Sequence, residues 1–436
     1  MAKNGVRVGW IYQPHDKQII RDGLLIWNDM KIEYIGKYDT RLTKEIDKYY
    51  NYEKGILLPA FINGHTHIPE TLLRGIVDDV KLEDWLYNHI WKIEPQMKPH
   101  DAMVGTKLGI AEMISCGTIG FVDQFYYAEE IAKSIIESGV KGFLAPSIFD
   151  DNPETGSAEM AFKRNKIIFK KYHKKNNQIM IGSVPHALYT VDLELFEEIG
   201  NFVKENNTKI NTHVLETKLE RENAFAMWNK STIEKMRDMN LLDHTIAAHV
   251  VHIDDNDLKM MANSDLTISH NIQSNLKLGS GIANIPAMQN NNINIIVGTD
   301  GNASNNNLDM LEEIRTVSLV HKGYNMNPEL VNKFNVIDFA TINANKVFND
   351  IYSGILEKGH WADFTIFDLS GIDATPNINP LSNLVYSISS NKCVMTVCNG
   401  NVLYENGKFH TIDIESVKKN AEKSISRMLE EANYEL

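Results

Sequence analysis

Short apolar runs recur along the middle of the chain and predict its main structural elements. They alternate with stretches in which apolar residues return every three or four positions, the spacing of an amphipathic helix. Continuous apolar runs are typical of strands buried on both faces, as in a parallel sheet. The eight runs are GILLPAF, TIGFVDQF, GFLAPSIF, IMIGSVPH, KINTHVLE, HTIAAHVV, DLTISHN and INIIVGTD. Their alternation with helices over residues 61–356 predicts an α/β fold, a (β/α)₈ barrel of the TIM type.

The two ends of the chain have a different pattern, with shorter β-like pieces separated by turns. VRVGWIY, GLLIWND and KIEYIGKY lie near the start, and ADFTIFDL and CVMTVCNGNVLYENGKF lie near the end. This pattern of short apolar pieces separated by turns indicates antiparallel strands, and we expect residues 1–60 and 357–412 to build one small β-sandwich domain. Residues 413–436 are expected to form a C-terminal helix. A doubly wound open sheet is the main alternative for the middle, but no glycine-rich phosphate loop follows its first strand.

Composition and charge narrow the range of partners. The 436 residues carry 44 Lys and Arg against 57 Asp and Glu, and the net charge of −13 disfavours nucleic acid as a partner. Cys116, Cys393 and Cys398 are too few for a disulfide framework and suit a reducing compartment. No leader-like segment opens the chain, and no apolar run is long enough to span a membrane. We therefore expect a soluble cytoplasmic protein that contacts neither nucleic acid nor a membrane.

Polar residues suited to metal binding stand at the ends of several predicted strands. In a barrel these ends converge on one face, so side chains far apart in sequence are expected to meet there. Taken singly, each residue has an ordinary interpretation as a hydrogen-bonded loop or turn residue, and only their agreement favours a metal site. Three histidines and one aspartate suit Zn²⁺, with Fe²⁺ as the alternative. The residues at these ends are His65, His67, His213, Glu216, His249, His252 and Asp300, of which His65, His67, His213 and Asp300 are the expected ligands.

Longer segments of the chain resemble the amidohydrolase superfamily, in its mononuclear deaminase branch. The match is to the 5′-methylthioadenosine/S-adenosylhomocysteine deaminases and, in part, to the related triazine hydrolases. The segments are PAFINGHTHIPETLLRG, DDVKLEDWLYNHIWKIEP, THVLET, SNLKLGSG and GTDGNASNNNLDMLEE. The fourth predicted strand ends in SVPHALYT, without the lysine that bridges two metal ions in other branches, so one divalent ion is expected. The resemblance also implies a barrel with a small β-sandwich from both termini, and a homo-oligomer.

The resemblance implies hydrolytic deamination of the adenine ring of a 5′-modified adenosine, giving the inosine analogue and ammonia. The implied substrates are 5′-methylthioadenosine, 5′-deoxyadenosine, adenosine and, as a further candidate, S-adenosylhomocysteine. A bound metal ion makes water acidic enough to attack near neutral pH. Glu216 would then shuttle a proton to N1, Asp300 would accept the proton of water, and His249 would orient the attacking group.

Other positions correspond to contacts with the rest of the nucleoside. Glu94 and His186 match ribose contacts, and Trp85 matches an aromatic residue that lines the pocket, although core packing explains Trp85 equally well. His252 is expected to be structural. Two alternatives stay open: a deaminase or dechlorinase of guanine, a pterin or an s-triazine, which should not need Glu94, and, more distantly, an inactive barrel scaffold.

One position departs from the relatives in a way that bears on the substrate. Pro146 stands where relatives commonly carry an arginine, and no arginine follows until Arg164. The bidentate partner for a homocysteine carboxylate is therefore missing at the expected place. We expect weaker use of S-adenosylhomocysteine, unless Arg74 or a lysine substitutes.

Overall fold

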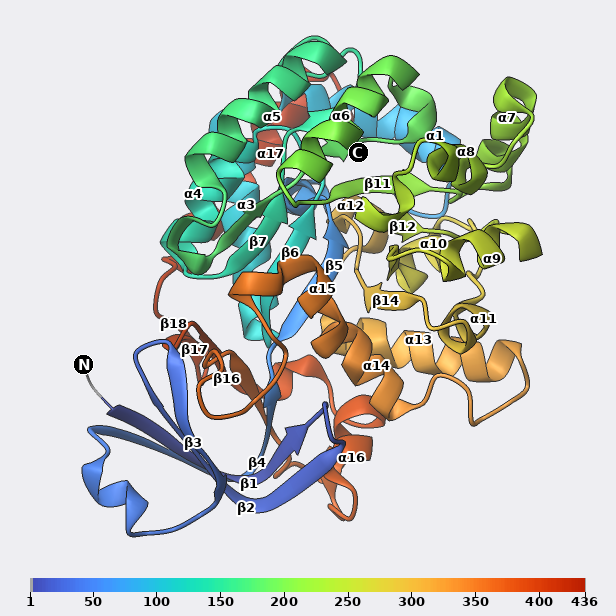
Figure 1. Ribbon diagram of the computed structural model, residues 1–436. Coiled ribbons are helices and arrows are strands. Elements are labelled where there is room, and N and C mark those ends of the chain that lie inside the picture. The colour runs from blue at the N-terminus through green and yellow to red at the C-terminus, as the bar shows by residue number, and fades with distance from the viewer. Residues whose placement is uncertain (1–2, 436) are drawn as a thin grey trace.

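Eight parallel strands run through the middle of the chain in the computed structural model, which describes residues 3–435 (Figure 1). They form two four-stranded sheets, each in chain order. One sheet contains β5 (Phe61–Thr66), β6 (Thr118–Asp123), β7 (Lys141–Leu144) and β9 (Ile179–Ile181), and the other contains β11 (Ile210–Val214), β12 (Thr245–His249), β13 (Thr267–His270) and β14 (Asn294–Val297). Two short strands, β8 (Ser147–Ile148) and β10 (Val184–Pro185), pair with each other beyond β7 and β9.

Backbone hydrogen bonds continue between these two sheets at both edges. After β9, the N–H of Ser183 donates to Lys209 O at 3.0 Å, and the Ser183 carbonyl accepts from Asn211 N at 2.9 Å. After β14, the N–H of Asp300 donates to His65 O in β5 at 2.9 Å. The strand pairs group into two separate four-stranded sheets. They establish a mixed α/β fold with eight parallel strands, and a single closed barrel stays a prediction.

The first apolar run occupies a different place from the one predicted. GILLPAF lies mostly in β4 (Lys48–Pro59), a strand of the terminal sheet, and only its last residue, Phe61, belongs to β5. Ala60 alone separates the two strands, and its carbonyl accepts a hydrogen bond from Tyr352 Oη at 2.8 Å. Each of the seven later runs contains the strand predicted for it. A continuous apolar run carries no sign of where the chain passes from one sheet to another.

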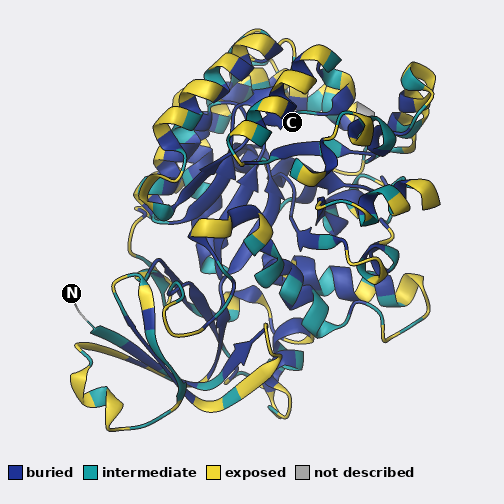
Figure 2. Ribbon diagram, viewed as in Figure 1, coloured by how far each residue is buried: buried dark blue, intermediate teal, exposed yellow. Residues whose placement is uncertain are grey.

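Amphipathic helices cover the outside of the strands, whose residues are buried (Figure 2). In α4, Ile131 and Ile135 are buried, and Gly139 ends the helix at a φ of 83°, which glycine adopts without strain. The helices around the eight strands are α3 (Pro99–Ser115), α4 (Ala128–Ser138), α5 (Ala158–Tyr172), α6 (Leu193–Glu205), α7 (Lys218–Trp228), α8 (Thr232–Asp238), α9 (Asp255–Ala262), α10 (Ile272–Lys277), α11 (Ile285–Asn290), α12 (Asn302–Asn305), α13 (Met310–Tyr324), α14 (Lys333–Ala340) and α15 (Asn345–Phe348).

Strands from the two ends of the chain pair in one eight-stranded sheet. Its order is β18-β17-β16-β15-β4-β1-β2-β3, and β15 joins the halves by running antiparallel to β4, with Phe364 opposite Pro59. The strands are β1 (Lys3–Gln13), β2 (Gln18–Asn28), β3 (Lys31–Lys37), β15 (Phe364–Asp368), β16 (Cys393–Cys398), β17 (Asn401–Glu405) and β18 (Lys408–Phe409). Both ends therefore build one β unit, whereas a sandwich of two sheets is not confirmed. CVMTVC is a strand with free cysteines, as expected.

Two further helices follow the terminal strands. The short helix α16 (Pro380–Tyr386) lies between β15 and β16 in sequence. The long helix α17 (Ile414–Glu431) packs against α3, and its buried residues Val417, Ala421, Ser424 and Met428 recur at helical spacing. A C-terminal helix is thus present where the sequence indicates one.

A buried ion pair connects the parallel strands to the terminal sheet. Lys141 in β7 pairs with Asp363, the residue before β15, and its side chain is fully buried. The other oxygen of Asp363 accepts a hydrogen bond from Asn399 N at 2.7 Å, and Lys141 also donates to Ile351 O. The ammonium and carboxylate therefore satisfy each other at the junction of the two units.

We expect Lys141→Met to lower the free energy of unfolding by about 3–5 kcal/mol, because it leaves the Asp363 carboxylate buried without its cation. Urea denaturation measures the change. Lys174→Met is the matched control, since Lys174 and Asp350 are both about half exposed and such a pair contributes about 0–1 kcal/mol. Equal losses in the two variants would contradict a structural role for the buried pair.

Candidate active site

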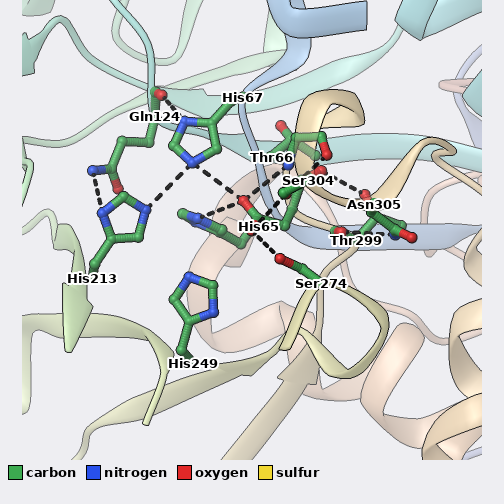
Figure 3. Close-up of polar contacts among 12 residues, drawn as sticks. His65, Thr66, His67, Gln124, His213, His249, Ser274, Thr299, Ser304 and Asn305 are labelled. Carbon is green, nitrogen blue, oxygen red and sulfur yellow. Dashed lines mark hydrogen bonds and ion pairs between the residues drawn. The ribbon is translucent and has the colours of Figure 1, made fainter. Parts of the chain in front are cut away.

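Four imidazoles and one carboxylate converge at the carboxyl ends of the parallel strands (Figure 3). His65 lies in β5, His67 follows it directly, His213 lies in β11, His249 ends β12 and Asp300 follows β14. The Oδ1 atom of Asp300 is 3.2 Å from His67 Nε2 and 3.6 Å from His65 Nε2, and His67 Nε2 is 3.3 Å from His213 Nε2. Two sets of side chains have ligand atoms within 4.8 Å of one another: His65, His67 and His213, and His65, His249 and Asp300.

Neighbouring polar groups fix the orientation of these rings. The Nδ1 atom of His67 lies 2.6 Å from Gln124 O, so Nδ1 donates its proton there and Nε2 is the nitrogen that faces the cluster. Gln124 Nε2 lies 3.2 Å from His213 Nδ1, and Asn275 Nδ2 lies 2.9 Å from His249 Nδ1. Gln124 follows β6 and Asn275 lies in α10, so both contacts come from other elements than those that carry the histidines.

The carboxylate of Asp300 is also fixed by hydrogen bonds on the side that faces away from His65 and His67. Its Oδ2 atom accepts hydrogen bonds from the hydroxyls of Ser274 at 2.6 Å and Ser304 at 3.0 Å. Oδ1, which faces His65 and His67, accepts from Gly301 N at 2.9 Å. Hydrogen bonds to a ligating carboxylate fix its position and are a regular feature of metal sites.

The electrostatics favour a cation at the centre of the cluster. Burial alone would raise the pKa of Asp300, but the hydrogen bond from His67 and the nearby imidazoles bring it well below its usual value. Burial would lower the pKa of His67, yet Asp300 and the carboxylate of Glu70 raise it to about 10. Burial and neighbouring imidazoles lower the pKa of His65 and His213 well below the usual range. His65 and His213 are therefore neutral imidazoles beside an ionised carboxylate, the forms that bind metals, whereas His67 gives up a proton when an ion binds.

His65 gives the clearest sign that this cluster fits a metal ion. Its side chain is fully buried, and neither Nδ1 nor Nε2 has a hydrogen-bond partner among residues 3–435. Buried polar atoms are almost always paired, and an ion absent from the coordinates is one accepted explanation for an exception. Three nitrogens and one carboxylate oxygen are a ligand set that suits zinc or iron.

Several strand ends in the site carry backbone strain. Leu215, His249, Val250 and Asp300 have φ values of 50°, 72°, 49° and 67°, which residues with a side chain rarely adopt. Each such residue costs about 1–3 kcal/mol and persists only where surrounding contacts enforce it, typically at functional sites. Backbone hydrogen bonds do so here, because Val214 O accepts from Val250 N at 3.0 Å.

A cavity of about 400 Å³ opens above the cluster. Its wall brings together residues from the cluster and the three positions that the sequence associates with the sugar and ring, Trp85, Glu94 and His186. Trp85 is buried, and its Nε1 donates to Ala303 O at 3.2 Å, so it both packs in the core and faces the cavity. Burial raises the pKa of Glu94 to about 7, and burial with the charge of His67 lowers that of His186 to about 4.

Glu216 also lines this cavity, just after β11. Its Oε2 is 3.8 Å from His249 Nε2, and its Oε1 accepts a hydrogen bond from Ser280 Oγ at 3.0 Å. The backbone N–H groups of Leu215 and Glu216 donate to the side chain of Glu220, which fixes the loop. His252 stands apart, because its Nε2 lies 2.8 Å from Ser280 O and it belongs to neither ligand set, as expected of a structural residue.

Comparison with known proteins places the chain in a family. A model of the amidohydrolase family matches residues 56–403. The chain belongs to the amidohydrolase family. It is 36% identical over 405 residues to a 5′-deoxyadenosine deaminase of Methanococcus aeolicus, covering 92% of this chain and 94% of that protein. It is 34% identical over 401 residues to a 5-methylthioadenosine/S-adenosylhomocysteine deaminase of Thermoanaerobacter pseudethanolicus, covering 92% and 93%.

Solved structures agree with this assignment. An adenosine deaminase from Xanthomonas campestris with bound zinc superposes with a TM-score of 0.93 at 25% identity, covering 98% of both chains. A triazine hydrolase from Arthrobacter aurescens has a TM-score of 0.90 at 20% identity, covering 98% of this chain and 100% of the other, which shows the shared fold. The predicted membership of the amidohydrolases is confirmed. Within residues 3–435, this amidohydrolase has no helix long and apolar enough to cross a membrane.

Other residues of this amidohydrolase's cavity were not identified from the sequence. Glu70 follows His67 by three positions in IPETLL, where it resembles an ordinary first-turn acid of a helix, and burial raises its pKa well above its usual value. Nothing in the sequence identified Gln124, Ser274 or Ser304, because their contacts with the expected metal-binding residues form only when separate segments of the chain fold together. Arg74, a suggested substitute for the missing arginine, instead pairs with Glu112 and does not line the cavity.

We expect His65→Ala to weaken zinc binding by more than about 100-fold, since even residues that only orient a ligand contribute about 10–100-fold. Metal content after dialysis against a weak chelator measures the effect. His252→Ala, a few residues after His249, is the control and should keep one zinc per chain. Full zinc occupancy in His65→Ala would rule out His65 as a ligand.

Proposed function

We propose that this amidohydrolase hydrolyses the 6-amino group of a 5′-modified adenosine, giving the inosine analogue and ammonia. One observation carries the proposal: imidazoles of the cluster and the carboxylate of Asp300 line the same cavity as Glu216, with Glu94 and His186 on its wall. Relatives that match over most of the chain are named as deaminases of 5′-deoxyadenosine or 5-methylthioadenosine. We propose 5′-methylthioadenosine, 5′-deoxyadenosine and adenosine as substrates.

The proposal includes the complete architecture expected from the sequence. The two parallel sheets would close into one (β/α)₈ barrel over residues 61–356, supported by the hydrogen bonds at both of their edges. Residues 1–60 and 357–412 would form a β-sandwich, supported by a shared core that includes Val6, Trp27, Phe364 and Met395. Residues 413–436 would be the C-terminal helix.

A cytoplasmic homo-oligomer is also proposed. All three cysteines are free, as a reducing compartment requires. Helix α7 leaves Leu219, Phe225 and Met227 about half exposed, and apolar side chains gathered on one helix suit contact with a second copy of the chain.

One divalent metal ion, Zn²⁺ in preference to Fe²⁺, would be held by His65, His67, His213 and Asp300. When bound, the ion supplies Lewis acidity that makes water a nucleophile near neutral pH. His249 has its Nδ1 fixed by Asn275, and its Nε2 faces the cavity near Glu216. From there His249 would orient the attacking water by hydrogen bonding.

Glu216 and Asp300 would move the protons. Carbon C6 of adenine is a weak electrophile until N1 is protonated, and Glu216, whose Oε2 lies toward His249 and the cavity, would donate that proton. Asp300 would accept a proton from the attacking water and pass it to the 6-amino nitrogen. The C6–N bond then breaks with its electron pair on nitrogen and ammonia leaves. The remaining proton of the C6 hydroxyl passes to Glu216 and restores its acid form, so C6 keeps oxygen as a carbonyl beside N1–H.

The sugar would be recognised on the opposite wall of the cavity. Glu94 can accept hydrogen bonds from two ribose hydroxyls, and His186 is kept neutral by burial, so it can donate or accept. Tyr126 Oη donates to Glu94 O at 3.0 Å and holds that segment in place. A guanine or triazine enzyme would have no use for this pair of polar groups.

No lysine or arginine of the described residues lines the cavity, and Asp150 stands at its wall. A homocysteine carboxylate would therefore meet no cation there and would be repelled by Asp150. This supports the expectation drawn from Pro146, and we propose that S-adenosylhomocysteine is a poor substrate.

The decisive test is ammonia release by the zinc-loaded protein with 5′-methylthioadenosine and S-adenosylhomocysteine in parallel. We expect kcat/KM to favour 5′-methylthioadenosine by at least about tenfold, equivalent to about 1.4 kcal/mol of transition-state stabilisation. Equal kcat/KM values would refute the proposal that the cavity disfavours a homocysteine carboxylate, and would leave the proposed deaminase activity intact. Turnover of free guanine, a pterin or a triazine without any nucleoside would overturn the proposed function, and inactivity on every substrate would favour the scaffold.

Glu216→Gln should lower kcat by about 10²–10⁴-fold, because the amide cannot deliver a proton to N1. Steady-state kinetics with 5′-methylthioadenosine and a zinc determination check the result, and zinc content should stay unchanged. Glu222→Gln is the control, since Glu222 is exposed on α7 beside Lys218. An unchanged kcat in Glu216→Gln would exclude the proposed proton transfer.

A further inference from the structure

Glu70 is a buried carboxyl group to which neither the proposed mechanism nor the sugar contacts give a role. It lies in the 3₁₀ turn Ile68–Leu73 that follows His67 directly. Only 6% of the residue is exposed, yet it lines the cavity. Its Oε2 atom has no hydrogen-bond partner among residues 3–435. An unpaired buried carboxyl is costly, so such a group in a ligand cavity calls for a partner on the ligand.

The surroundings place this carboxyl next to the metal-binding residues. A Cβ atom built on Gly301 would lie 2.2 Å from Glu70 Oε2 and 3.1 Å from His67 Cβ. The carboxyl therefore packs against the backbone of the residue after Asp300, where only glycine leaves room. The N–H of Glu70 donates to His67 O at 2.9 Å, which fixes the turn against the end of β5.

We propose that Glu70 accepts a hydrogen bond from the 6-amino group of the purine and from the ammonia that it becomes. This inference rests on the proposed function, which requires C6 to lie at the cluster of His67 and Asp300. The substituent on C6 then lies on the side of the cavity where Glu70 meets Gly301. In either protonation state a carboxyl group keeps an acceptor oxygen, and both the amine and ammonia carry N–H donors.

Glu70 neither gains nor loses a proton during the reaction. The departing nitrogen takes the electron pair of the C6–N bond and a proton from Asp300, and Glu70 only accepts hydrogen bonds from it. A chloride or methoxy substituent offers no donor, and its electronegative atom would face the carboxyl oxygen. Glu70 is therefore a residue that selects an amine leaving group over a halide or an ether.

The competing interpretation is that Glu70 serves the sugar together with Glu94. Both carboxyl groups line the same cavity, and burial raises the pKa of each. Loss of a sugar contact would lower kcat/KM by the same factor whatever the substituent on C6. The two interpretations therefore differ in one measurable quantity, the preference for amine over chloride on an otherwise identical nucleoside.

The test compares kcat/KM of the zinc-loaded enzyme for adenosine and for 6-chloropurine riboside. Glu70→Met, which keeps the length of the side chain and removes its acceptors, should lower the adenosine value about 10- to 100-fold, because the amine donor is then left unpaired in the cavity. The chloro value should stay unchanged or rise. Glu70→Gln retains an acceptor oxygen and should lie between wild type and Glu70→Met. Zinc content is measured in each variant and should equal that of the wild type.

Glu94→Gln is the matched control, because a sugar contact should lower both values by the same factor. An equal fall of both values in Glu70→Met, or a loss of zinc, would overturn the inference and leave the deaminase assignment intact. A wild-type enzyme that releases chloride but no ammonia would overturn the proposed function and the inference together.

Discussion

The hydrogen bond from Asp300 N to His65 O joins β14 to β5 and, at the same place, assembles the cluster of imidazoles and carboxylate. It brings the first and the last of the eight parallel strands together, so that a carboxylate meets imidazoles separated from it by more than half of the chain. The approach is possible because Gly298 has no side chain: a Cβ there would lie 2.4 Å from His65 N. Asp300 adopts a φ of 67° to turn its carboxylate inward. The junction of the two sheets and the geometry of the site thus depend on the same few atoms.

This arrangement makes the site a region of low intrinsic stability. Positive φ at His249 and Val250, unpaired nitrogens on His65 and an unpaired oxygen on Glu70 all oppose folding. The surrounding strands offset this cost, because their residues are almost entirely buried and the apolar clusters around them are extensive. Ligands that satisfy the unpaired groups would also stabilise the fold by binding only to the native state.

The ends of the strands could be predicted from the sequence, because an apolar run followed by polar residues is a local pattern. Polar residues directly after apolar runs predicted His65, His213 and Asp300, and the structure brings these together. GILLPAF was assigned to the wrong strand, since an unbroken apolar run does not reveal that Ala60 marks a change of sheet. Glu70 was missed for a different reason. Its neighbours in sequence suggest a helix start, and its position against Gly301, more than two hundred residues later, exists only in the folded chain.

The wall of the cavity that carries Trp85 and Glu94 is built by a different part of the chain from the histidine cluster. Trp85 and Glu94 lie in a segment formed by α1 (Leu82–Asp84), the π-helical turn Trp85–Ile90, α2 (Trp91–Ile93) and the 3₁₀ turn Glu94–Gln96. The C-terminal helix holds this segment: Arg427 donates to Gln96 O at 3.3 and 3.2 Å, and Lys98 pairs with Glu431 at 2.7 Å. The histidine cluster depends on strand geometry that tolerates little change, whereas the wall with Trp85 and Glu94 depends on surface contacts between a short segment and α17. Sequence changes in that segment can therefore reshape the wall while the strand ends stay the same.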